Sequence, residues 1–150
     1  MNRQPRPLLL ELTCLLGGPP ARVFRAMTDP AEVVRWWGPQ GFTTPHAQID
    51  LRVGGSYRFA MQPPEGDVFH LFGEFLRIDP PNSLSYSFQW DPPDPDDRQT
   101  VVALSLNAVG NATEVTLAQG EFATQARLVL HRDGWTDSFE KLRGFINKTQ

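Results

Sequence analysis

The chain has 150 residues, of which 40% are hydrophobic and 21% charged, and we expect a single globular domain over residues 1–150 with a sizeable core. A formal net charge of −3, without any basic run, argues against a nucleic-acid-binding protein. No apolar stretch has the length of a signal peptide or a membrane span, and the single cysteine, Cys14, excludes an internal disulfide, so we expect a cytoplasmic protein.

The first forty residues predict a strand followed by two short helices. Residues 8–16 are apolar with polar interruptions, which is typical of a strand, and the Gly-Gly-Pro-Pro sequence at 17–20 ends it sharply. A helix then begins near Pro20 and is broken by Thr-Asp-Pro at 28–30 before a second one from about Ala31 to Trp36. The turn that follows places Trp36 and Trp37 side by side at the end of this helix.

Between about residues 44 and 120 the hydrophobic pattern has a period of two, which predicts an antiparallel meander. The expected strands cover residues 46–53, 56–62, 68–79, 84–90, 100–108 and 113–119. With the first strand they make about seven, a usual number for one sheet. Proline and aspartate fill 91–97, for which we expect an exposed hairpin tip.

The facing of the strand over 68–79 is ambiguous, because two alternating sets of residues compete for its inner side. One set is Phe72, Glu74, Leu76 and Ile78, and the other is Leu71, Gly73, Phe75 and Arg77. We predict that the first set points inward, since the charged side chain of Arg77 faces water more easily.

The stretch from about Thr124 to Lys148 predicts one long amphipathic helix. It contains no proline and repeats large side chains at spacings of three and four: Leu128, His131, Trp135, Phe139, Leu142 and Phe145 or Ile146. Gly134 in its middle costs about 1 kcal/mol of helix propensity, which suggests close packing beside Trp135. At 1.5 Å per residue the helix would extend about 35 Å, enough to cross a whole sheet.

This order of elements carries five short motifs that resemble a known superfamily. They are PARVF at 20–24, WWGP at 36–39, GGSYR at 54–58, the segment from GE at 73–74 to PP at 80–81, and HRDGW at 131–135. Together they resemble the START-like (SRPBCC) superfamily, and more narrowly the branch of homologues of the activator of the 90-kDa heat-shock protein ATPase. The resemblance covers nearly the whole chain, with the motifs in order.

The resemblance implies an α+β helix-grip fold, in which a curved antiparallel sheet wraps around the C-terminal helix. It also implies a cavity for hydrophobic molecules such as lipids or polyketides. The superfamily includes carriers, receptors and cyclases, so the fold does not decide the function.

The leading hypothesis is non-catalytic binding of a small hydrophobic or aromatic ligand, without a cofactor. The expected walls are Trp37, Met61, Phe72, Phe88, Trp90, Trp135 and Phe139. Glu74 and His131 are the expected polar anchors. We expect no metal, since His46, His70 and His131 form no ligand motif.

Two alternatives remain open from the sequence. In the first, the chain is a cofactor-free cyclase or dehydratase in which His131 and Glu74 move a proton. In the second, the core is filled and the chain is a protein-interaction or stress-response module, which predicts an exposed apolar patch. A homodimer is a candidate assembly in each case.

Overall fold

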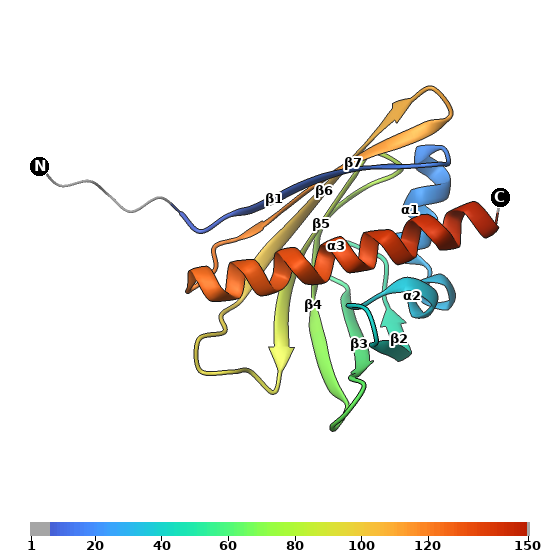
Figure 1. The fold of residues 1–150 in the computed structure, drawn as a ribbon. Coiled ribbons are helices and arrows are strands. Elements are labelled where there is room, and N and C mark those ends of the chain that lie inside the picture. The colour runs from blue at the N-terminus through green and yellow to red at the C-terminus, as the bar shows by residue number, and fades with distance from the viewer. Residues whose placement is uncertain (1–6, 150) are drawn as a thin grey trace, which may run out of the picture.

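A computed structural model describes residues 7–149 of the chain (Figure 1). Within this part the elements follow the predicted order of strand, two short helices, six strands and a long helix. They are β1 (Leu10–Leu16), α1 (Pro20–Thr28), α2 (Pro30–Trp36), β2 (Thr43–Ile49), β3 (Ser56–Gln62), β4 (Phe69–Asp79), β5 (Ser83–Asp91), β6 (Thr100–Val109), β7 (Ala112–Gly120) and α3 (Gln125–Lys148).

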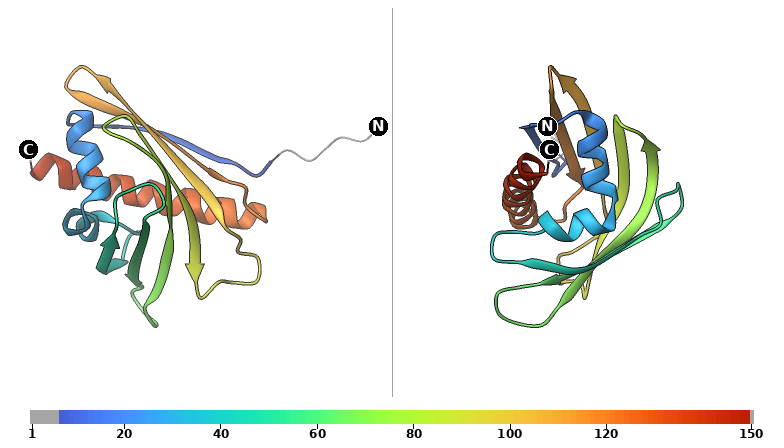
Figure 2. Two further views of the ribbon diagram at one scale, coloured as in Figure 1. Left: turned by 180° about the vertical axis from the view of Figure 1, so that it is seen from behind. Right: turned by 90° about the vertical axis from the view of Figure 1, so that its right-hand side faces the viewer.

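The strands form one antiparallel sheet in the order β1-β7-β6-β5-β4-β3-β2. Strands that follow one another from β2 to β7 are neighbours, and β1 joins the sheet at the far edge by pairing with β7. The sheet curls around α3, which crosses its concave side (Figures 1 and 2). The predicted helix-grip fold is therefore confirmed. No helix among residues 7–149 is long and apolar enough to cross a membrane.

The inner face of the sheet follows the predicted alternation on most strands. On β5, Leu84, Tyr86 and Phe88 are buried, while the residues between them are polar. On β6 and β7 the burial alternates with the same period, and the inward residues are buried: Val102, Leu104, Leu106, Val115 and Leu117. These side chains form one contiguous core with the buried stripe of α3.

The predicted facing of β4 is wrong for Phe72, Glu74 and Leu76. Leu71 and Phe75 face the core instead and are 0% and 4% exposed. Glu74 is exposed, and Leu76 is 46% exposed. In the first half of β4 the charged Glu74 therefore faces water and the apolar Leu71 and Phe75 face the core, because burying apolar side chains is favourable and burying a charge is not.

A β-bulge explains why no single alternation describes β4. Phe75 pairs with Tyr86, but the next pair joins Arg77 to Ser85, so β4 has one more residue than β5 at this point. The extra residue reverses the alternation beyond it. Ile78 consequently returns to the inner side, where it packs against the core as predicted.

The strand predicted over 46–53 ends earlier, at Ile49, because a tight turn follows. The backbone N–H of Gly55 donates to the carbonyl of Arg52 at 2.8 Å, and Gly54 has a φ of +84°. A Cβ on Gly55 would lie 2.2 Å from the carbonyl oxygen of Asp50. The Gly-Gly pair is therefore required by the turn, which leaves Val53 63% exposed.

The backbones of β4 and β5 approach each other closely at Gly73. A Cβ on Gly73 would lie 1.9 Å from the carbonyl oxygen of Ser87, and that same oxygen accepts a 2.6 Å hydrogen bond from the Tyr57 hydroxyl. We expect Gly73→Ala to lower the free energy of unfolding by about 1–3 kcal/mol or more, because the methyl group would force β4 and β5 apart. Urea denaturation followed by tryptophan fluorescence measures the change.

The matched control is Gly144→Ala in α3, where an added Cβ meets no atom within 4 Å. This control should gain up to about 1 kcal/mol, since alanine favours helix over glycine. A Gly73→Ala protein as stable as the unsubstituted chain would contradict the assigned approach of β4 and β5.

Candidate functional site

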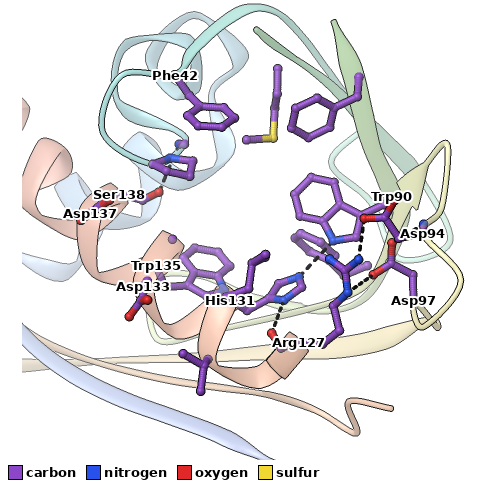
Figure 3. A pocket seen from close by; sticks show the side chains of 18 of the residues that line it. Phe42, Trp90, Asp94, Asp97, Arg127, His131, Asp133, Trp135, Asp137 and Ser138 are labelled. Carbon is purple, nitrogen blue, oxygen red and sulfur yellow. Dashed lines mark hydrogen bonds and ion pairs between the residues drawn. The ribbon is translucent and has the colours of Figure 1, made fainter. Parts of the chain in front are cut away.

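A cavity of about 740 Å³ opens between the N-terminal half of α3 and the sheet (Figure 3). Two loops complete its walls: the α2–β2 loop, residues 37–42, and the β5–β6 loop, residues 92–99. Its volume falls within the usual range for small-molecule sites. Most of its lining side chains are apolar: Trp37, Pro39, Phe42, Met61, Phe69, Phe88, Trp90, Pro92, Ala126, Val129, Leu130 and Trp135.

Six of the nine predicted site residues line this cavity: Trp37, Met61, Phe88, Trp90, His131 and Trp135. Phe139 lies outside it, buried in the core one helical turn from Trp135, with the two ring centroids 5.5 Å apart. Phe72 and Glu74 lie on the outer side of β4 and do not reach the cavity, which corrects the prediction for both. There the Phe72 ring contacts the guanidinium of Arg58 at 5.8 Å.

The structure adds Phe42 and Phe69 to the aromatic wall. Their ring centroids are 6.2 Å apart and edge-on, and Phe69 is 5.5 Å from Trp90. Phe69 shares the inner side of β4 with Leu71, so a correct facing of this strand would have predicted it. Phe42 lies in a turn, where no periodicity indicates its direction.

His131 is committed to two hydrogen bonds within the protein. The indole N–H of Trp90 donates to its Nε2 at 3.0 Å, and its Nδ1 lies 2.9 Å from the carbonyl oxygen of Arg127. Because Nε2 accepts, the proton of the neutral ring belongs on Nδ1, which donates to that carbonyl. Burial lowers the pKa of His131 and so favours this neutral form.

The proton-transfer pair of the cyclase or dehydratase alternative is therefore not assembled. Glu74 is exposed on the outer side of the sheet, whereas His131 is buried on its inner side. The lone pair of His131 that a base would use is occupied by Trp90. Among residues 7–149, moreover, no three His, Cys, Asp or Glu side chains are grouped to hold a metal ion.

The β5–β6 loop is fastened to α3 by an ion cluster around Arg127. The guanidinium donates to Asp94 and to Asp96, the latter at 3.0 Å, and lies 3.3 Å from Asp97. This hydrogen bond from Arg127 lowers the pKa of Asp96 below its ordinary value. The loop is thus a tethered cavity wall, which the expectation of a simple exposed hairpin tip missed.

The α2–β2 loop is fastened to α3 by a second set of contacts. The ammonium of Lys141 donates to backbone carbonyls of this loop, including those of Gly38 at 3.0 Å and Phe42 at 3.3 Å. The backbone N–H of Gly38 donates to the hydroxyl of Ser138 at 3.1 Å. Both loops therefore take their positions from α3, on opposite sides of the cavity.

Gly134 lies between these two attachments, at the mouth of the cavity. An added Cβ would meet only Pro39 Cγ, at 3.8 Å, which is ordinary van der Waals contact. The expected close packing beside Trp135 is therefore wrong. The absence of a side chain here leaves the space between α3 and the α2–β2 loop open.

Comparison with known proteins identifies the family. The family described as "Activator of Hsp90 ATPase homolog 1-like protein" (AHSA1) matches residues 18–147. The chain belongs to this family. The AHSA1 match confirms the resemblance inferred from the motifs, because it places the chain in the SRPBCC/START-like superfamily. No curated protein matches the chain.

Solved structures similar to this AHSA1 chain share its fold over nearly the whole length. A protein from Chromobacterium violaceum has a TM-score of 0.85 and 23% identity, covering 93% of this chain and 96% of that one. The AHSA1 protein from Silicibacter pomeroyi has a TM-score of 0.82 and 26% identity, with coverages of 95% and 99%. CalU16 from Micromonospora echinospora has a TM-score of 0.70 and 27% identity, with coverages of 92% and 75%.

The neutral state of His131 predicts a pH dependence of stability. Because burial lowers its pKa in the folded protein, the unfolded chain binds the proton first as the pH falls, so folding loses stability below about pH 6.5. We expect the free energy of unfolding to fall more between pH 7.5 and pH 5.5 in the unsubstituted protein than in His131→Gln. Urea denaturation at both pH values measures this, and equal losses in the two proteins would contradict it.

Removing the cation of the Arg127 cluster should lower stability more than removing an exposed ion pair does. We expect Arg127→Gln to lower the free energy of unfolding by about 1–2 kcal/mol, because the Arg127 side chain is only 15% exposed and its loss removes the cation beside Asp97, whose side chain is 7% exposed. The control is Arg52→Gln, whose pair with Asp50 is exposed. That substitution should cost less than about 0.5 kcal/mol. Equal losses in the free energy of unfolding of the two variants, measured by urea denaturation, would show that the cluster stabilises the fold no more than an exposed ion pair does.

Proposed function

We propose that this protein binds a small hydrophobic or aromatic molecule in the cavity between α3 and the sheet, without catalysing a reaction on it. The observation that carries the proposal is the aromatic cavity of about 740 Å³, which is open to solvent in a domain otherwise packed by one contiguous core. Ligand-binding members of the superfamily support the same assignment.

The indole and imidazole groups of the cavity support binding over proton transfer by His131. The indole N–H of Trp90 is bonded to His131, and that of Trp135 donates to Gln119 at 2.8 Å. His131 has no free lone pair for a substrate proton. A reaction would need an acid or base held ready at the ligand, whereas these groups hold the walls together.

The size of the cavity sets the expected affinity. At about −0.3 kcal/mol per non-hydrogen atom, a ligand of about 20 such atoms reaches about −6 kcal/mol, which corresponds to a dissociation constant of tens of micromolar. Most of that free energy comes from removing apolar surface from water. A cavity of this kind favours a flat or branched apolar body that contacts several rings at once.

The experiment uses 9-anthracenemethanol, an uncharged aromatic probe, and follows quenching of tryptophan fluorescence. We expect saturable quenching, since Trp37, Trp90 and Trp135 line the cavity. Gly134→Leu should weaken binding by about tenfold or more, because the new side chain extends across the mouth toward Pro39.

The matched control is Gly144→Leu, the same substitution in the same helix. Gly144 has open space around it and is not among the lining residues, so affinity should stay unchanged. No saturable quenching in the unsubstituted protein would overturn the proposed function. Equal affinities in the two leucine variants would show that the probe binds somewhere other than this cavity.

A further inference from the structure

The charged residues that line the cavity are unbalanced. Four carboxylates, those of Asp94, Asp97, Asp133 and Asp137, stand against the single guanidinium of Arg127, a formal charge of −3. This equals the net charge of the whole chain, so the remainder of the sequence is balanced. The excess is local to the one cavity that the proposed function uses, where low-dielectric walls strengthen its effect on a bound ligand.

The cation that lines the cavity, Arg127, and the nearby Lys141 are already engaged with the protein, and Arg98 and Arg132 are exposed and do not line the cavity. Arg127 donates to two carboxylates and lies 3.3 Å from a third, that of Asp97. Lys141 directs its ammonium at backbone carbonyls of the α2–β2 loop and is not a lining residue. An anionic ligand group that took Arg127 would have to displace these contacts and leave the carboxylates without their cation.

The carboxylates of Asp133 and Asp137, by contrast, are not neutralised by a lining cation. They lie one helical turn apart on α3, at the mouth, and Figure 3 shows them on the opposite side of the cavity from Asp94 and Asp97. The carboxylate of Asp137 accepts one hydrogen bond, from the backbone N–H of Gln40 at 3.2 Å. Even if Lys141 is counted against Asp137, the cavity keeps a formal charge of −2.

The aromatic wall suits the apolar body of such a ligand. Phe42, Phe69 and Trp90 form a connected group of rings in the cavity. These rings offer apolar contact surface to the body of a ligand. The apolar wall and the acidic rim therefore favour one kind of molecule, with an apolar body and a positive charge at one end.

We propose that the ligand of this cavity is an amphiphilic cation, whose aromatic or aliphatic body fills the apolar interior and whose amine or quaternary ammonium group lies at the mouth beside Asp133 and Asp137. The proposal rests on the function proposed above and adds the ligand's charge. The apolar body supplies the affinity, and the rim carboxylates supply the preference for positive over negative ligands.

Three probes with one anthracene skeleton test the preference by quenching of tryptophan fluorescence at low ionic strength. They carry a trimethylammonium-methyl, a hydroxymethyl or a carboxylate group at position 9. We expect the cation to bind about tenfold more tightly than the carboxylate, with the alcohol between them, and the difference to shrink in about 0.5 M salt as screening increases.

The variant Asp133→Asn/Asp137→Asn tests whether the rim causes this preference. It should weaken binding of the cation about fivefold and leave the alcohol unaffected, because asparagine keeps the shape and an acceptor oxygen for Gln40 but no charge. The control Glu11→Gln/Glu114→Gln changes the net charge by the same amount at exposed positions of β1 and β7, outside the cavity, and should leave the cation's affinity unchanged.

The outcomes separate the two proposals. If the alcohol fails to bind, the proposed function is overturned together with the inference. Equal binding of all three probes, or tightest binding of the carboxylate, overturns the charge preference and leaves the function standing. If the control weakens the cation as much as the rim variant does, the preference reflects the net charge of the protein, and the role assigned to Asp133 and Asp137 is wrong.

Discussion

Trp135 joins three parts of the fold at one buried point. Its indole N–H donates to Oε1 of Gln119 on β7 at 2.8 Å, and its ring meets that of Trp37 edge-on at 5.0 Å. The other end of the Gln119 amide donates to the hydroxyl of Thr100 at 2.9 Å, so a side chain only 1% exposed has partners for both its donor and its acceptor. The helix, the sheet and the α2–β2 loop are thereby held at a fixed separation, and the cavity depends on this separation.

The space on the concave side of the sheet is filled at one end and hollow at the other. α1 and α2 lie toward the C-terminal half of α3 (Figures 1 and 2), and their buried side chains, such as Val23 and Trp36, join the core there. Over the N-terminal half of α3 the α2–β2 and β5–β6 loops complete the walls instead of helices. Loops leave room that helices would fill, which explains why the cavity is lined by residues 126–138 of α3 and not by later ones.

The parts of the site that the sequence predicted are those whose direction follows from periodicity. His131 and Trp135 lie on one stripe of a helix, and Phe88 and Trp90 lie on a regularly alternating strand. In each element the periodicity predicts the direction of both side chains. On β4 the alternation changes at the bulge after Phe75, so no single alternation describes the strand. The wrong facing therefore predicted the outward residues Phe72 and Glu74 for the site and missed Phe69.

The loop contacts could not be predicted in the same way. Arg127 meets Asp96 across thirty-one residues of chain, and an ion pair at that separation leaves no periodic signal. The concentration of acidic residues in the β5–β6 loop was the one available sign, since so many carboxylates close together favour a nearby cation. The sequence analysis drew no partner from this composition and expected an exposed hairpin tip, and only the fold shows that the cation, Arg127, stands on the first turn of α3.

In the proposed binding, the interior of the cavity and its rim have different roles. Inside, the indole N–H groups of Trp90 and Trp135 and both nitrogens of His131 are bonded to the protein, so these side chains contribute mainly contact area. Apolar contact area contributes binding free energy but distinguishes little between ligands with different functional groups. Charge acts over a longer range and has a sign, so the rim can discriminate where the interior does not. If the cavity binds as proposed, substitutions at the mouth, at positions such as Gly134 and Asp133, would change ligand preference while the packing of the sheet on α3 stays intact.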